Sequence, residues 1–133
     1  MVVVVQIDGA LFGTLEEFFA HFGEQAGSTP WGTNLDAFND VLRGGFGTPD
    51  GGFVLRWKNH AVSQERLGYE ETARVLERRL ASCHLSNRPQ VEQELASARD
   101  REGTTVFDWL LEIIREHGPG GREAEDLVML ELA

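Results

Sequence analysis

Apolar residues gather along the chain in short continuous runs and in helical stripes. The first run, Val2–Ile7, is rich in β-branched residues, which is typical of a strand buried on both faces. Two later runs, Phe53–Trp57 and Leu127–Leu132, also have strand character. Because helical stripes separate these strands, we expect them to pair in parallel through right-handed crossovers. The pattern therefore predicts an α/β fold.

Capping signals mark three helix starts. Thr14–Glu17 has the spacing of a capping box, in which the hydroxyl accepts one backbone N–H and the carboxylate reaches back to another. The helix that follows is predicted to bury Leu15, Phe18, Phe19 and Phe22. The same signal at Thr33–Asp36 opens a short helix that stops at Arg43–Gly45. A third signal, Thr105–Asp108, opens an apolar helix that ends at His117–Pro119.

Two segments complete the chain. Gly44–Gly52 holds five glycines and a proline, so we expect a flexible loop. His60–Gly103 is rich in Glu, Arg and Ala and shows two narrow apolar stripes, which predict two helices packed as an α-hairpin. The stripes are Tyr69, Ala73, Leu76 and Leu80, and, after a helix start at Pro89, Val91, Leu95 and Ala98. No break in composition indicates a second domain.

The short helix after Thr33 has a polar side. At about 100° per residue, one arc collects Leu35, Ala37, Phe38, Val41 and Leu42, and the opposite arc collects Asp36, Asn39, Asp40 and Arg43. Two carboxylates four residues apart repel each other, which costs a few tenths of a kcal/mol. The helix N-terminus stabilises Asp36, but Asp40 lies beyond it. Asp40 is therefore either part of a solvated face or a binding residue.

The helix after Thr105 has a polar stripe of its own, made of Asp108, Glu112, Arg115 and Glu116. Three of these four residues are acidic and lie at successive turns. A solvated face in which Arg115 pairs with Glu112 or Glu116 explains the stripe equally well.

Charge limits the classes of partner. Twelve Lys and Arg face 22 Asp and Glu, which gives a formal net charge of −10 and a pI of about 4.8. Such a surface repels nucleic acids and anionic membranes and attracts basic proteins, although it also serves solubility alone. Cys83 is the single cysteine, so no internal disulfide is expected. With an opening run too short for a signal peptide, we expect a cytoplasmic protein that does not span a membrane.

The segment Trp31–Gly44 resembles the signature of the barstar family. It reads Trp-Gly-Thr-Asn-Leu-Asp-Ala-Phe-Asn-Asp-Val-Leu-Arg-Gly, in which an aromatic residue and a glycine lead into Asn-Leu-Asp-Ala, followed by Asp, Leu and Gly at fixed offsets. The order of strands and helices around it also matches. The resemblance covers nearly all of residues 1–133 as a single domain, with about 64–103 as a helical insertion.

The resemblance implies a three-stranded parallel sheet packed by helices. It also implies a bacterial antitoxin or immunity protein that inhibits a basic, barnase-type, guanyl-specific ribonuclease one-to-one, as a monomer, without catalysis, cofactor or metal. In the family, the motif helix and the loop before it plug the nuclease active site, and Asp40 takes the place of the central acidic anchor. The partner-binding residues implied are Trp31, Gly32, Asn34, Asp36, Asn39, Asp40, Gly44, Glu112 and Glu116.

The chain departs from the family pattern at three positions where aromatic residues are frequent, which here are Pro30, Asn39 and Gly45. Aromatic residues are typical anchors of protein interfaces, so we hypothesise that the fold is kept and the partner is not the standard ribonuclease. One alternative is immunity to a toxin of another class.

Enzyme readings have weaker support in the sequence. A Mg²⁺-dependent hydrolase would use Asp36, Asp40 and Glu112 as oxygen ligands, but no known metal motif accompanies them. The histidines, His21, His60, His84 and His117, are scattered without the spacing of metal ligands. Direct nucleic-acid binding is disfavoured because no basic stripe with interleaved aromatic residues occurs.

Overall fold

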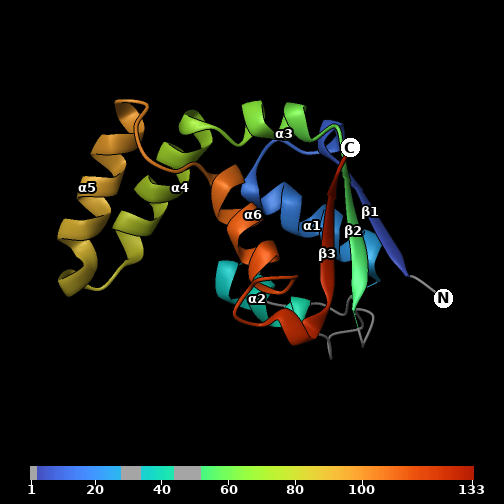
Figure 1. Cartoon of the computed structure of the whole chain (residues 1–133). Coiled ribbons are helices and arrows are strands. Elements are labelled where there is room, and N and C mark those ends of the chain that lie inside the picture. Colours follow the sequence, from blue (N-terminus) through green and yellow to red (C-terminus); the bar gives the residue numbers. More distant parts are fainter. Residues whose placement is uncertain (1–2, 28–33, 44–51) are drawn as a thin grey trace.

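The structure is a computed structural model, and it describes residues 3–27, 34–43 and 52–133. Three strands and six helices follow one another along this part of the chain (Figure 1). They are β1 (Val4–Asp8), α1 (Leu15–Ala26), α2 (Leu35–Leu42), β2 (Phe53–Lys58), α3 (His60–Arg66), α4 (Tyr69–Ser82), α5 (Arg88–Arg99), α6 (Val106–Glu116) and β3 (Val128–Leu132). Most of the predicted Gly44–Gly52 loop lies outside the described residues.

The strands form the predicted parallel sheet, with β2 in the centre and β1 and β3 at its edges. Leu55 of β2 is in register with Val5 of β1 and with Leu130 of β3. The third strand starts at Val128, one residue later than predicted, because Leu127 adopts a left-handed backbone conformation with a φ of 55°. The fold is therefore a three-stranded parallel sheet packed by helices.

The prediction that the first strand is buried on both faces is wrong. β1 begins at Val4, and its side chains alternate, so that Val5 is 4% exposed and Val4 is 44% exposed. Val4 is in register with Val54, and Val54 with Met129, which is 47% exposed. None of the described helices covers this outer face of the sheet, so its apolar side chains border solvent.

Aromatic rings fill the core between the inner face of the sheet and the helices. The predicted stripe of α1 is confirmed, because Leu15, Phe18, Phe19 and Phe22 are all buried. Phe18 stacks on Trp57 of β2 at 5.4 Å between ring centroids and meets Phe38 of α2 edge to face at 5.3 Å. Phe38 thereby holds one side of α2 against the core and leaves the opposite side toward solvent.

The helix starts agree with the capping signals at α1 and α6, which begin after Thr14 and Thr105. At α2 the cap is Asn34, whose Oδ1 accepts a hydrogen bond from the backbone N–H of Ala37 at 2.8 Å. An Asn side chain caps a helix as well as a hydroxyl does, so α2 starts one residue later than the signal at Thr33 predicts. Thr33 itself lies outside the described residues.

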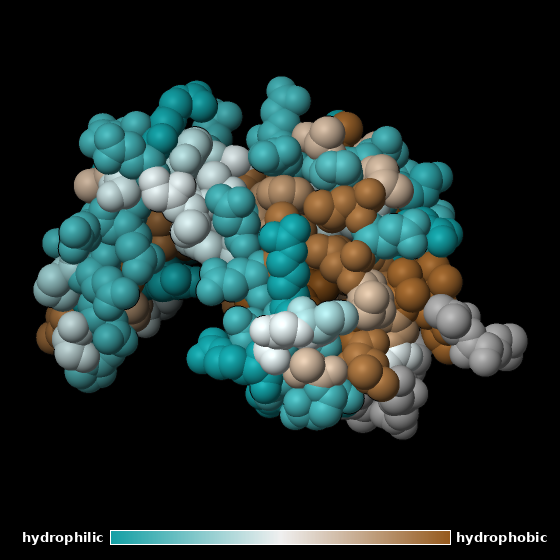
Figure 2. All heavy atoms as spheres, viewed as in Figure 1, coloured by the Kyte–Doolittle hydropathy of each residue, from teal (hydrophilic) through white to brown (hydrophobic). Residues whose placement is uncertain are grey.

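The helices α4 and α5 form the predicted α-hairpin, which projects on the side away from the sheet (Figure 1). Its own small core consists of Leu76, Val91, Leu95 and Ala98. The hairpin surface is mainly hydrophilic, whereas apolar residues are exposed around β3 (Figure 2). Among the hydrogen bonds that join α4 to the rest of the fold, two are buried: Glu71 Oε2 accepts the N–H of Leu15 at 2.8 Å, and Thr72 Oγ1 accepts the N–H of Val106 at 2.9 Å.

Candidate functional site

Two carboxylates of α2 point away from the core. Asp36 and Asp40 are exposed, whereas Phe38, Val41 and Leu42 on the other side of the helix are buried. The Asp36 carboxylate has no hydrogen-bond or ion-pair partner among the described residues, and it lies in the first turn of the helix, where negative charge is favourable. The structure therefore presents the two acids side by side on solvent, as the helical spacing predicts.

Asp40 is held by a cation of its own helix. Arg43 Nη1 lies 2.7 Å from Asp40 Oδ1, and the Nε of the same guanidinium donates a hydrogen bond to Glu123 Oε1 at 2.8 Å. Asp40 remains 53% exposed, so this ion pair is screened by water and leaves the second carboxylate oxygen accessible. The hydrogen bond from Arg43 to Glu123 raises the pKa of Arg43.

Asn39 differs from its predicted outward placement. Its Oδ1 lies 2.6 Å from Nε2 of His117, which is 0% exposed at the C-terminal end of α6. The helical wheel assigns Asn39 to the polar arc, but it cannot foresee a polar group inside the fold for Asn39 to meet. The amide therefore takes part in an interior contact at the border between α2 and α6.

Three further predicted positions, Trp31, Gly32 and Gly44, lie outside the described residues. Asn34 is described, and its side-chain oxygen serves as the cap of α2. A capping residue fixes where the helix begins and thus where the acids that follow it point. The geometry gives Asn34 this role within the fold, and its contact with a partner stays a prediction.

The two α6 acids predicted to bind a partner are Glu112 and Glu116, four residues apart and hence on one face of the helix. Glu116 does not pair with Arg115 as the sequence suggested, but with Arg122, whose Nε donates a hydrogen bond to Glu116 Oε2 at 2.9 Å. Hydrogen bonds from the Arg122 guanidinium and backbone lower the pKa of Glu116. The Glu112 carboxylate is exposed and has no hydrogen-bond or ion-pair partner among the described residues.

The α2 and α6 residues meet at one surface hollow, whose lining consists of Asn39, Arg43, Glu116, Arg122 and Glu123. The structure thus brings one acid of the late helix close to the turn of α2 that carries Asp40. Arg122 and Glu123 were missed by sequence reasoning, because both lie in the turn after α6 and share no periodicity with it. No motif in the sequence signals them.

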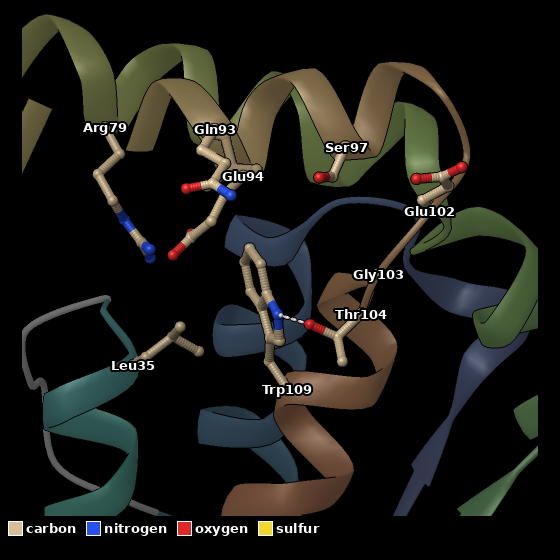
Figure 3. A pocket seen from close by; sticks show the side chains of 10 residues that line it. Leu35, Arg79, Gln93, Glu94, Ser97, Glu102, Gly103, Thr104 and Trp109 are labelled. Atoms are coloured by element: carbon tan, nitrogen blue, oxygen red, sulfur yellow. Dashed lines mark hydrogen bonds between the residues drawn. The ribbon is translucent and has the colours of Figure 1, made fainter. Parts of the chain in front are cut away.

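A second hollow, of about 480 Å³, separates α2 from the hairpin. Leu35 of α2 and Trp109 of α6 form its apolar side, and the close-up shows Arg79 and Glu94 of the hairpin pointing into it (Figure 3). Trp109 is fixed there, since its Nε1 donates to Thr104 Oγ1 at 2.9 Å and Arg79 lies over its ring at 5.5 Å. The hairpin therefore borders α2 at Leu35, across this hollow.

Among the described residues, the one group with the arrangement of metal ligands is His117, Glu123 and Asp126, whose ligand atoms lie within 4.8 Å of one another. Glu123 already accepts a hydrogen bond from the Arg43 guanidinium, and a cation at this distance opposes a second one. The cluster is best described as a hydrogen-bonded network. Asp36, Asp40 and Glu112, the ligands of the hypothetical hydrolase, do not converge.

The comparison with protein families agrees with these features. The family model described as Barstar (barnase inhibitor) matches residues 2–107, a span that contains α2 and ends within the first turn of α6. A search among curated proteins gave no match. In the described part of the chain, every helix is too short or too polar to cross a bilayer. From the match over most of its length, together with the parallel sheet and the acidic helix, the chain belongs to the barstar family.

Proposed function

We propose that this protein inhibits a basic, barnase-type ribonuclease by placing the acidic side of α2 in the nuclease active site. The observation that carries the proposal is the exposure of Asp36 and Asp40 on one side of a helix whose other side is fixed in the core. Family membership supports it, since the family is described by its inhibition of barnase.

The chemistry of a ribonuclease site supports this role. Such a site collects cationic groups that hold the RNA phosphate, and a carboxylate can occupy the same place through short charge-assisted hydrogen bonds. Asp40, with one oxygen held by Arg43 and the other accessible, is the best-placed anchor. The net charge of −10 attracts a basic partner over the Debye length and raises the association rate.

The partner-binding surface of this proposal combines residues of both helices and the loops beside α2. It comprises Trp31, Gly32, Asn34, Asp36, Asn39, Asp40, Gly44, Glu112 and Glu116. The shared hollow between α2 and α6 supports the inclusion of Glu116. The inhibitor would act one-to-one in the cytoplasm, where the free thiol of Cys83 stays reduced.

We also propose that residues 1–133 act as a single domain, with about 64–103 as a helical insertion. Two buried hydrogen bonds support this, one from the N–H of Leu15 to Glu71 and one from the N–H of Val106 to Thr72, because they tie α4 to α1 and α6. The hairpin would then flank α2 at the hollow that Leu35 lines.

The test is a titration of a barnase-type ribonuclease with the purified protein, following RNA cleavage at low and moderate salt. We expect stoichiometric inhibition that weakens in Asp40→Ala by several kcal/mol, or more than about a hundredfold, a range for which barnase and barstar are themselves a known example. Glu92→Ala is the matched control, because Glu92 is 55% exposed and pairs with Arg88 of its own helix. Equal effects of the two substitutions would show that Asp40 contributes only to the overall negative charge and does not anchor the nuclease.

A second candidate is a basic toxin other than a barnase-type ribonuclease. The observation that favours it is Asn39, which contacts His117 at a position where the family often presents an aromatic residue to its partner. If micromolar protein leaves a barnase-type ribonuclease fully active, the family assignment stands and this second candidate is preferred.

A further inference from the structure

His117 is a buried polar junction between elements that are distant in sequence. It is 0% exposed, and both of its ring nitrogens lie 2.6 Å from an oxygen atom, Nε2 from Asn39 Oδ1 of α2 and Nδ1 from Asp126 Oδ2. Its backbone carbonyl also accepts the N–H of Val128 at 2.9 Å, where β3 begins. One residue thus joins α6, α2, the turn before β3 and β3 itself.

The charged groups around the ring come from three segments. Glu123 Oε2 lies 3.4 Å from Nε2, and Asp126 contacts the other nitrogen. Arg43, the C-cap residue of α2, donates to Glu123, and Arg122 binds Glu116, the residue before His117. Asn39 in α2 and Arg43 at its C-terminal cap, one turn apart, are therefore both tied to the segment 117–126.

We infer that His117 is a positioning residue, which through Asn39 fixes the rotation of α2 and hence the direction of the Asp40 carboxylate. The inference rests on the proposed function, since it concerns the residue that would anchor the nuclease. Asp40 directly follows Asn39 in the helix, so a fixed Asn39 side chain leaves the next residue little freedom to turn. His117 itself cannot touch a partner, because it is fully buried.

Apolar packing alone does not fix the rotation of α2, whereas a directional polar contact does. Phe38, Val41 and Leu42 bury α2 against the core, but apolar contacts tolerate small rotations and slides. A buried polar pair is satisfied in one orientation, and any other orientation leaves desolvated polar atoms without partners. Holding a binding group in its bound orientation before association strengthens the complex.

The first arm of the test uses the free protein and needs no partner. Asn39→Leu removes the polar contact at nearly constant volume, whereas Asn39→Asp keeps an oxygen at the same place. We expect Asn39→Leu to speed amide hydrogen exchange in the last turn of α2 about tenfold more than in α1, and Asn39→Asp to restore it. Equal acceleration in both helices would overturn the inference, because the contact would then affect only the overall stability. No acceleration in α2 would overturn it as well, because the contact would then not hold this helix.

The second arm measures inhibition far below the melting temperature of each variant. We expect His117→Gln to weaken inhibition of the nuclease about tenfold, and this effect to disappear in an Asp40→Ala background. Unchanged inhibition, or a loss that simply adds to that of Asp40→Ala, would contradict a role that acts through Asp40. If the unaltered protein does not inhibit the nuclease, the proposed function fails and the exchange arm alone decides whether His117 positions α2.

Discussion

Arg43 binds the carboxylate of Asp40 from one turn away on the same helix, with 2.7 Å between Nη1 and Oδ1. The same guanidinium donates to Glu123, so Arg43 is held from two sides. This contact keeps the Asp40 side chain in one orientation and at the same time neutralises part of its charge. For an inhibitor that meets a cationic site, the partial neutralisation opposes binding, since the Arg43 guanidinium and a cation of the partner would share the Asp40 carboxylate and repel each other.

Replacing Arg43 by Gln should therefore strengthen nuclease binding. The gain should be about 1 kcal/mol or less, because the ion pair is exposed and screened by salt. The association rate should rise most at low salt, because loss of the Arg43 charge makes the protein more negative and its attraction for a basic partner is then least screened. Stopped-flow association and dissociation rates over a range of salt concentrations measure both effects. Weaker binding would show instead that the orientation imposed by Arg43 matters more than its charge.

The buried Glu71 offers a test of the single-domain proposal. Glu71 is 6% exposed, accepts the N–H of Leu15 and pairs with Arg74 at 2.6 Å. Glu71→Ala should lower the free energy of unfolding by about 2–3 kcal/mol, at or below the lower limit for a broken buried pair, because Arg74 is 37% exposed. Urea unfolding followed by circular dichroism measures it, and a single transition should persist.

The control for Glu71 is Glu77→Ala on the same helix. Glu77 pairs with Arg99 at 2.7 Å, but the two side chains are 54% and 59% exposed. Loss of this exposed ion pair should lower the free energy of unfolding by less than about 1 kcal/mol. Two separate transitions in any of these proteins would show that the hairpin unfolds on its own, against the single-domain proposal.

Acid should weaken the contact between β1 and the turn after β2. Asp8 accepts hydrogen bonds from the Asn59 side chain at 2.8 Å and from the Ala10 N–H at 2.9 Å, and these lower its pKa from 3.8. Because the folded pKa lies below the unfolded one, the stabilisation is complete above about pH 3.8 and is lost as the pH falls through the folded pKa. The melting temperatures of the native protein and Asp8→Asn should therefore differ at neutral pH and converge in acid. A constant difference at all pH values would contradict the assignment.

The sequence predicted the elements whose signals are local. Capping residues at Thr14 and Thr105 and the apolar stripes of α1 and α5 depend on neighbours within a few turns, and the structure confirms them. The stripe of α4 is confirmed in part, because Leu76 is buried and Ala73 and Leu80 are partly buried against the hairpin core, whereas the buried Val75 was not predicted. The short helix α3 was missed, because its 7 residues are too few to show a period.

The site was predictable only where it depends on the helix itself. The exposed pair Asp36 and Asp40 follows from spacing along α2. The contacts of Asn39 with His117 and of Arg43 with Glu123 join residues 78 and 80 positions apart, which no local pattern encodes. The prediction that the first strand is buried on both faces was wrong for the same reason. A β-branched composition does not reveal how many layers of helices cover a sheet.

That open sheet face leads to the last prediction. Met129 on the outer face is 47% exposed, whereas Leu55 on the inner face is 0% exposed. Met129→Gln should change the free energy of unfolding by less than about 0.5 kcal/mol, because little apolar surface leaves the interior. Leu55→Ala should cost about 2–5 kcal/mol, since it opens a cavity in the central strand. Chemical unfolding of the two variants measures the difference, and a large loss in Met129→Gln would mean that the outer face is covered in solution.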